Sequence, residues 1–311
     1  MMLTENERAF GVVFIMILVV AIPATLTLHT VDQPGIRQIP ADPTPLGYTW
    51  SLLLFFVPLA AMAYWFLSHP GYSFQKRAFW KTIALLTPVG IGLDVFFGND
   101  FLRFENHEAT LGIGFPAFGG PLPVEEIIFY VTGFMVTLLS YIWADEYWLR
   151  SYNVPDYEAE AGNIQGALRF HGKSAWIGLA LLAAAVAYKN ILADPPGGFP
   201  AYFAYLCAGS FVPSMGLFRT TEPFINWRAF GFTLTWIVLV SLLWEATLAL
   251  PYGWWGYQES AMVGIFVGAW SRLPLEAVLV WLAVTFTTVI IFESVKIWIA
   301  SRRGLRKFLM G

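Results

Sequence analysis

DVFFGNDFLRFENHEATLGIGFPAFGGPLPVEE (residues 94–126) is followed 151 residues later by EATLALPYGWWGYQESAMVGIFVGAWSRLPLEA (residues 245–277), and the two stretches follow one pattern. Each begins with an acid at the end of an apolar segment and reaches, 29 residues later, the proline that opens the next apolar segment. A carboxylate at the centre of a spanning helix costs roughly 2.5–3.5 kcal/mol on insertion scales, so an acid in such a place is a candidate for function. The duplicated pattern therefore points to both the architecture and the functional site.

The composition is that of a polytopic membrane protein. The chain has 311 residues, of which 57% are hydrophobic and 13% charged, and its mean hydropathy is +0.60. The net charge of -3 gives no indication of a nucleic-acid partner, and the single cysteine, Cys207, excludes an internal disulfide and a cysteine-based metal site. Aromatic residues make up 17% of the chain, which suits interfacial belts and pockets for a large apolar ligand.

Apolar runs predict an all-α fold of about eight transmembrane helices in two parallel pseudo-repeats. Residues 10–28 are long enough to cross about 30 Å of hydrocarbon and show no cleavage site, so they are expected to be a span rather than a signal peptide. The first repeat is expected over residues 1–150, a polar linker over 151–172 and the second repeat over 173–311. The eight predicted spans are 9–28, 48–68, 79–97, 123–147, 173–192, 199–218, 229–249 and 274–300. A shift of 151 residues places the second, third and fourth on the sixth, seventh and eighth.

Basic residues predict the orientation. With this topology most of them fall at one end of the spans, and only Arg37, Arg103, Lys189 and Arg272 fall at the other. By the positive-inside rule both termini are expected in the cytoplasm, with the chain in the cytoplasmic or an equivalent inner membrane. Four spans per repeat then relate the repeats by an axis along the membrane normal.

The acids beside each proline allow a structural interpretation. Proline is favoured in the first turn of a helix, where no hydrogen bond is lost, so Pro123 and Pro274 are predicted to begin spans. Glu125, Glu126 and Glu276 then lie in the first turn, where the helix dipole favours negative charge. On this interpretation they are ordinary interfacial glutamates.

The functional interpretation joins these three glutamates to Asp94 and Glu245 on the axis of the bundle. Carboxyl groups crowded into an apolar pocket resist ionisation, so at least one is expected to stay protonated at neutral pH, as general acid catalysis requires. Because Glu125 and Glu126 are adjacent, they point about 100° apart on a helix, and only one is expected to face a cavity.

The other polar residues give weaker evidence for a functional site. The long aromatic loops 99–120 and 251–273 are expected to fold back over the bundle as a lid, with His107 either shuttling a proton or simply solvated. Arg103 and Arg272 either pair with the acids or lie at the interface. The pattern predicts a local ion pair between Glu293 and a snorkelling Lys296. Neither a metal ion nor a dinucleotide cofactor is indicated by the spacing of histidines, acids or glycines.

The residues around both prolines resemble the integral-membrane, non-flavin lycopene cyclase family, whose members occur as two small hydrophobic subunits or as one fused chain. The resemblance covers about half the chain. In the first copy it rests on Leu93-Asp94 and Pro123-Val124-Glu125-Glu126-Ile127-Ile128-Phe129-Tyr130. In the second it rests on Trp244-Glu245, Trp254-Trp255-Gly256-Tyr257 and Pro274-Leu275-Glu276-Ala277-Val278-Leu279-Val280-Trp281. The second copy has Glu245 in place of the aspartate and Ala277 in place of the second glutamate.

The resemblance implies an isomerase of the intramolecular-lyase type, a lycopene beta-cyclase-like enzyme that needs no cofactor. An acid protonates the terminal double bond of a linear carotene, the neighbouring double bond closes a six-membered ring, and loss of a ring proton gives a β-ionone ring. The implied acid is Glu126 or Glu125, with Glu276 or Asp94 as proton acceptor or charge partner and Glu245 in the same catalytic group. The aromatic faces expected to bind the substrate and stabilise its cation are Phe104, Trp254, Trp255 and Tyr257.

The expected partner is an apolar carotenoid or isoprenoid taken from the bilayer, with a second copy of the chain or other carotenoid enzymes as further partners. Two other classes fit the same features. Parallel repeats with intramembrane carboxylates also describe a proton-coupled transporter, although its acids would be expected at the midplane. A non-catalytic carotenoid- or isoprenoid-binding membrane protein is the third interpretation.

Overall fold

The computed structural model describes residues 44–69, 75–153, 158–164 and 166–310, and most of them are helical. Seven of the described helices are long and apolar enough to cross a membrane, so the chain is an all-α polytopic membrane protein. The expected span 9–28 and the cytoplasmic N-terminus lie outside the described residues.

The seven spans match the other predicted ranges closely. They are α2 with α3 (Gly47–Ser51 and Leu53–Ser68), α4 (Lys76–Phe101), α5 with the π-helix η2 (Glu125–Trp143 and Ala144–Trp148), α7 (Gly172–Ile191), α8 with η4 (Ala201–Thr221 and Glu222–Phe224), α9 with the π-helix η5 (Trp227–Trp244 and Glu245–Ala249) and α10 (Leu275–Ser301). Short elements η3 (Arg150–Tyr152), α6 (Glu158–Asn163) and α11 (Leu305–Met310) lie outside the spans.

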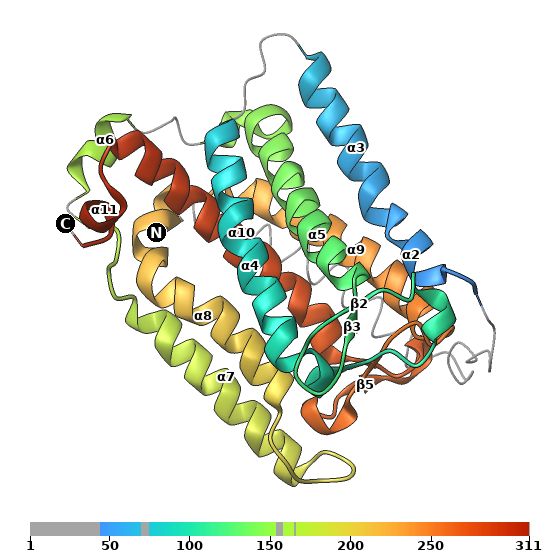
Figure 1. Ribbon diagram of the computed structural model, residues 1–311. Helices are drawn as coiled ribbons and strands as arrows, with labels where there is room; N and C mark the ends of the chain where they lie inside the picture. Colours follow the sequence, from blue (N-terminus) through green and yellow to red (C-terminus); the bar gives the residue numbers. More distant parts are fainter. Residues whose placement is uncertain (1–43, 70–74, 154–157, 165, 311) are drawn as a thin grey trace.

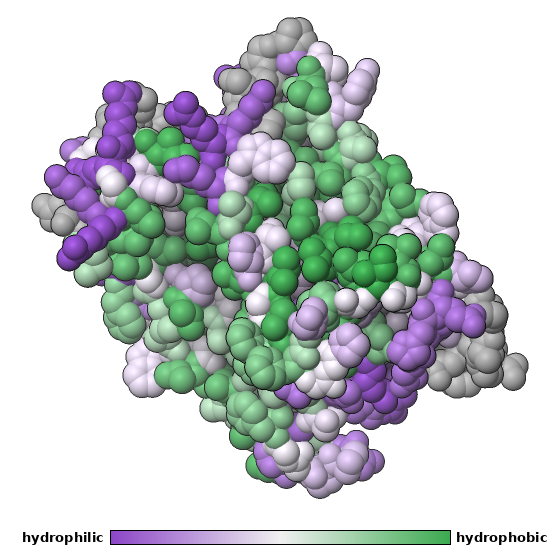
Figure 2. All heavy atoms as spheres, viewed as in Figure 1, coloured by the Kyte–Doolittle hydropathy of each residue, from purple (hydrophilic) through white to green (hydrophobic). Residues whose placement is uncertain are grey.

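α10 is the centre of the bundle and packs against α4, α5, α8 and α9 (Figure 1). α3 lies on one side of the bundle, where it packs on α5, and α7 lies on the other side, where it packs on α8. The loops with short strands gather at one end of the spans, and α6 and α11 lie at the other. On the face shown in Figure 2, apolar side chains cover the middle of the molecule, with hydrophilic residues at these two ends. This distribution suits a protein that crosses a bilayer.

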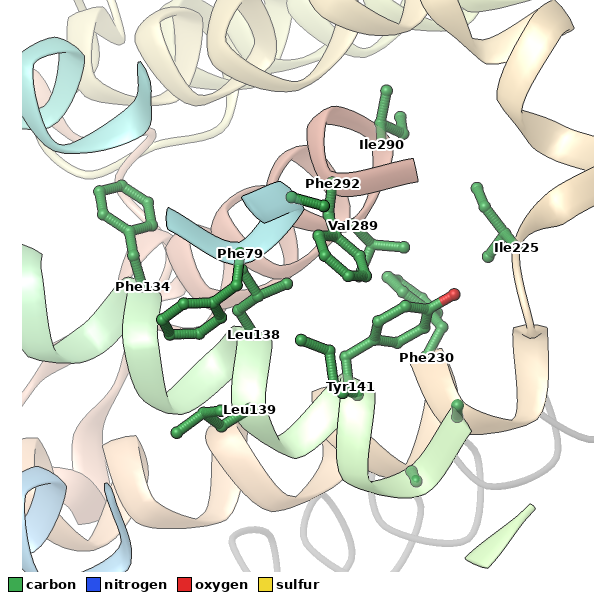
Figure 3. Packing of buried hydrophobic residues seen from close by; sticks show 14 of the residues in the cluster. Phe79, Phe134, Leu138, Leu139, Tyr141, Ile225, Phe230, Val289, Ile290 and Phe292 are labelled. Carbon is green, nitrogen blue, oxygen red and sulfur yellow. The ribbon is translucent and has the colours of Figure 1, made fainter. Parts of the chain in front are cut away.

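The main hydrophobic core fills the half of the bundle nearest α6 and α11. α4, α5, α9 and α10 contribute interlocking side chains, so these four helices form one rigid body (Figure 3). The labelled members are Phe79, Phe134, Leu138, Leu139, Tyr141, Ile225, Phe230, Val289, Ile290 and Phe292.

The two aromatic loops have similar elements, although the second loop has one additional 3-10 helix. The loop after α4 contains β1 (Leu102–Arg103), η1 (His107–Ala109), β2 (Gly114–Phe115) and β3 (Leu122–Pro123). The loop before α10 contains β4 (Gly256–Tyr257), η6 (Glu259–Ala261), β5 (Phe266–Val267), η7 (Gly268–Trp270) and β6 (Leu273–Pro274). β2 pairs with β3 and β5 with β6, whereas β1 pairs with β4 and so joins the two loops.

Matching backbone details recur in the two loops at offsets of 151 or 152 residues. Gly112 and Gly264 both adopt a positive φ, of 70° and 98°, which glycine accepts without steric cost. The amide of Val124 donates to the carbonyl of Ile113, and the amide of Leu275 donates to that of Ile265, each over 2.9 Å.

The polar linker predicted over 151–172 is more than a surface connection. It contains the short helix α6, and Ala161 and Ala167 in this range are buried against Phe308 of α11. The amides of Ala167 and Leu168 donate to carbonyls of α11, over 2.9 and 3.1 Å. The range expected to be a linker therefore packs against the C-terminal helix, which folds back onto it.

Candidate functional site

A small buried cavity lies at the end of the bundle that carries the loops. Its volume is about 80 Å³, and its walls come from α2, α5, α8, α9 with η5, α10 and both loops. Two acids, Glu126 and Glu245, line it, and most other lining residues are aromatic. The lining residues are Tyr48, Leu102, Glu126, Phe129, Tyr130, Gly133, Phe134, Tyr202, Trp244, Glu245, Trp255, Tyr257, Val280, Trp281 and Val284.

Glu126 enters the cavity from the first turn of α5, and only 4% of its surface is exposed. The hydroxyl of Tyr48, from α2, donates a hydrogen bond to its Oε1. Asp94 lies close enough to Glu126 for the two carboxyl groups to interact electrostatically. Two acids in contact in a dry pocket repel each other when both are ionised, so this pair is suited to hold a proton.

Asp94, the other member of this pair, lies about two turns before the end of α4. The hydroxyl of Tyr130, one helical turn after Glu126, donates to Asp94 Oδ1 over 3.0 Å. The ring of Tyr130 lies against Gly90, where an added Cβ would come within 2.5 Å of the ring. A glycine at this position therefore allows the close approach that brings Tyr130 to Asp94.

Glu245 is held differently. It begins the π-helix η5, a local widening of the helix that is frequent at functional sites. Three donors bind its carboxyl group: Ser241 Oγ at 2.9 Å, Trp281 Nε1 at 3.4 Å and the hydroxyl of Tyr257. Burial, together with the Glu245 carboxylate, raises the pKa of Tyr257 well above its ordinary value of 10.0, so this phenol remains a donor. The three donors therefore hold the Glu245 carboxyl group in one orientation.

The ring donors to the two acids occupy equivalent positions. Tyr130 and Trp281 are 151 residues apart, as are Asp94 and Glu245, to which they donate. Glu126 has no such counterpart, because Ala277 stands at the equivalent position. The cavity is therefore chemically asymmetric, with a carboxyl pair on one side and a single hydrogen-bonded carboxyl group on the other.

Glu125 and Glu276 do not line the cavity, although both are fully buried. Oε1 of Glu125 accepts from the amide of Leu111 at 2.7 Å and from Thr49 Oγ1 at 2.6 Å. Oε1 of Glu276 accepts from the amide of Val263 at 2.6 Å. Both glutamates therefore fasten the aromatic loops to the first turn of a span.

The four residues predicted to bind the substrate also fall into two groups, those that line the cavity and those that do not. Trp255 and Tyr257 line the cavity, whereas Phe104 and Trp254 lie behind it. Phe104 stacks on Tyr48 at a centroid distance of 6.4 Å, and Trp254 Nε1 donates to Thr44 Oγ1 at 2.5 Å. These two residues therefore support the wall of the cavity from outside.

Several lining residues were absent from the predicted site. Tyr130 and Trp281 lie in the two repeated motifs, and the offset of 151 residues links them to the two acids. Tyr48 carried no signal, because it lies before the duplicated stretch and reaches Glu126 only through the fold. The further aromatic walls are Phe129, Tyr202 and Trp244.

The loop arginines and His107 lie apart from the acids. Arg103 pairs with Glu105 at 3.4 Å and Arg272 with Glu259 at 3.2 Å, and all four side chains are largely solvent-exposed. His107 is exposed on η1. These residues belong to the loop surface, so of the two alternatives for the arginines the structure supports a position at the interface.

A second polar cluster lies at the opposite end of the bundle. Lys296 Nζ is 3.4 Å from Glu293 Oε2 and 4.0 Å from Asp145 Oδ2, and all three side chains are at least 97% buried. Tyr141 donates to Glu293 at 3.0 Å and Asn226 to Asp145 at 2.9 Å. The predicted ion pair is present, but the prediction of a snorkelling lysine was wrong, because α5 and α9 cover it.

Within the described ranges no group of three or more histidine, cysteine, aspartate or glutamate side chains is arranged to hold a metal ion. No protein-family model, curated protein or solved structure matches the chain. The chemistry of the site therefore has to be argued from its own residues.

Proposed function

We propose that this protein is a membrane-embedded isomerase that closes a ring at the end of a linear isoprenoid, as the resemblance to lycopene cyclases implies. The observation that carries the proposal is that Glu126 and Glu245 line one buried aromatic cavity. Such a ring closure needs a proton donor, a proton acceptor and walls that stabilise a carbocation while excluding water. The cavity offers all three.

The proton donor in this scheme is the pair formed by Glu126 and Asp94. One proton shared by two neighbouring carboxyl groups keeps their combined charge low in an apolar environment. The pair transfers this proton to the terminal double bond of the substrate, which becomes a tertiary carbocation. Tyr48 and Tyr130 hold the two carboxyl groups in place.

Ring closure and proton loss then use the opposite wall. The neighbouring double bond attacks the cation, a carbon–carbon bond forms, and the positive charge moves onto the new ring. Trp255 and Trp281 present aromatic surfaces that stabilise a cation by about 0.5–2 kcal/mol each. Glu245, held by its three donors, takes the proton from the adjacent ring carbon. One proton enters and one leaves, so substrate and product are isomers.

The architecture supports this function in two further ways. The recurrence of acids, ring donors and loop hydrogen bonds at one offset supports two parallel repeats that arose by duplication, with the cavity between them. The apolar lipid-facing surface supports a substrate that arrives from the bilayer. The basic residues at the end that carries α6 and α11 support a cytoplasmic C-terminus.

The test is ring closure by purified protein in lycopene-containing vesicles made in deuterated water. We expect a cyclised product of the same elemental composition that carries one deuterium per ring, because the donated proton exchanges with solvent before transfer. Chromatography and mass spectrometry separate the outcomes. A product without deuterium would exclude protonation by a carboxyl group, and unchanged lycopene would exclude the cyclase function.

The same preparation discriminates the two alternative classes. A proton-coupled transporter would leave lycopene unchanged and move protons when its solute is supplied. A non-catalytic binder would retain lycopene through purification without altering it. The position of the cavity at one end of the spans favours the enzyme over a transporter, whose site is expected near the midplane.

A further inference from the structure

The acid cavity continues outward between α4 and α8. A second cavity of about 130 Å³ adjoins it and shares Tyr130 and Tyr202 as wall residues. Its outer walls are Val89 of α4 and Gly209 of α8, and 57% of Val89 is exposed. Asp94 lines this second cavity, so a molecule that passes through it meets the carboxyl pair before it enters the innermost space.

A third and larger hollow, of about 610 Å³, lies further along the same two helices toward the loops. It shares Phe101 and Tyr205 with the second cavity. The three spaces thus lie in a row toward the acids, with volumes of about 610, 130 and 80 Å³, and neighbouring spaces share wall residues. We call this feature the α4–α8 crevice.

Aromatic rings close the crevice at its narrowest contacts. Phe101 of α4 lies 5.0 Å from Tyr202 and 5.5 Å from Tyr205 of α8, measured between ring centroids. Phe97 lies 6.4 Å from Tyr205 in the same row. Ring contacts of this kind can separate by side-chain rotation, without breaking a backbone hydrogen bond. The contact between α4 and α8 can therefore open here when these rings rotate.

We propose that the α4–α8 crevice binds the extended apolar tail of a membrane-dissolved isoprenoid whose end group occupies the acid cavity. The innermost space can accept only the end of a long molecule, and the remainder needs an apolar path that reaches the bilayer. The crevice is such a path. The identity of the ligand rests on the proposed function, whereas the path itself rests on the three adjoining cavities and on the aromatic contacts between them.

Substitution of Gly209 tests the crevice without touching the acids. An added Cβ at Gly209 meets no atom within 4 Å, so Ala, Leu and Trp at this position fill the crevice by increasing amounts. Gly92 of α4 is the matched control, because its added Cβ is equally free and it lines none of the three cavities. The probe is lycopene, supplied in vesicles, with bound pigment measured by absorbance after purification and turnover measured by chromatography.

We expect Gly209→Leu and Gly209→Trp to lower bound lycopene and kcat/KM together by roughly tenfold or more, as when an apolar pocket excludes its ligand. Gly92→Trp should stay near the unaltered protein, and Gly209→Ala should show a smaller decrease than Gly209→Leu. If Gly209→Leu, folded by circular dichroism, binds and turns over lycopene normally, the crevice is not the binding path. An unaltered protein that binds no lycopene would also overturn the proposal.

If the proposed catalysis is wrong but the proposed binding path is right, the same experiment gives a different result. In that case the unaltered protein binds lycopene without cyclising it, and Gly209→Leu still abolishes binding. Glu126→Gln provides the complementary control, because it should retain bound pigment while losing turnover. Loss of pigment from Glu126→Gln but not from Gly209→Trp would place the ligand outside the crevice.

Discussion

Glu125 and Glu126 are neighbours in the chain but have different surroundings. One helical step of about 100° turns Glu125 toward the amide of Leu111 and Glu126 into the cavity. From the sequence it could be predicted that only one of the two glutamates faces a cavity. Which of the two does so could not be predicted, because it depends on where the loop and Tyr48 lie in the folded protein.

The first prediction separates the two glutamates. Glu126→Gln removes the transferable proton while keeping the shape, so product formation should fall by about 10²–10⁴-fold, the usual contribution of general acid catalysis. Glu125→Gln should retain most activity, because the amide oxygen can still accept from Leu111. Product formed from lycopene in membranes with equal amounts of each variant is the measurement. Equal losses in both variants would contradict the assignment.

The second prediction concerns Lys296. Replacing it by methionine leaves the buried Asp145 and Glu293 without their shared cation, and removal of one partner of a buried ion pair typically costs about 3–5 kcal/mol. Lys81→Met is the control, because the exposed Lys81 lies 3.8 Å from the ring of Trp298, a contact worth about 0.5–1 kcal/mol. Denaturant unfolding in detergent measures both. A Lys296→Met protein as stable as Lys81→Met would show that the cluster does not depend on its lysine.

Helices and loops differ in how far they could be predicted. Hydropathy placed the seven described spans within a few residues, because a bilayer demands continuous apolar helices. The π-helices η2 and η5 escaped prediction, since one extra residue per turn leaves no mark on an apolar run. The pairing of β1 with β4 also escaped it, because two-residue strands carry no periodic pattern.

At the scale of elements, the third prediction concerns how a loop is attached to a span. Glu276→Ala leaves the amide of Val263 without its acceptor inside a buried site, and an unsatisfied buried donor costs about 1–3 kcal/mol. Faster hydrogen exchange over residues 256–267 is therefore expected. Glu276→Gln keeps an acceptor oxygen and should exchange like the unaltered protein. Equally fast exchange in both variants would mean that charge, rather than the hydrogen bond, holds the loop.

At the scale of the whole molecule, the fourth prediction concerns orientation. Basic residues are concentrated at the end that carries α6 and α11, and the positive-inside rule places this end in the cytoplasm. A reporter fused after Gly311 should be active in the cytoplasm, and one inserted between α7 and α8, over residues 193–199, should be active on the opposite side. Reporters that indicate one compartment for both sites would contradict the alternation of the described spans.

The pairing of β1 with β4 also determines when the cavity can form during synthesis of the chain. Leu102 pairs with Tyr257, and Glu126 shares its cavity with Trp281, so the ribosome must add about 155 more residues before either contact can form. During that interval the first four described helical segments already occupy the membrane with Asp94 and Glu126 unshielded by the later helices. The cavity lined by Glu126 and Glu245 is therefore among the last parts of the molecule to be completed, and a nascent chain that stalls early lacks it.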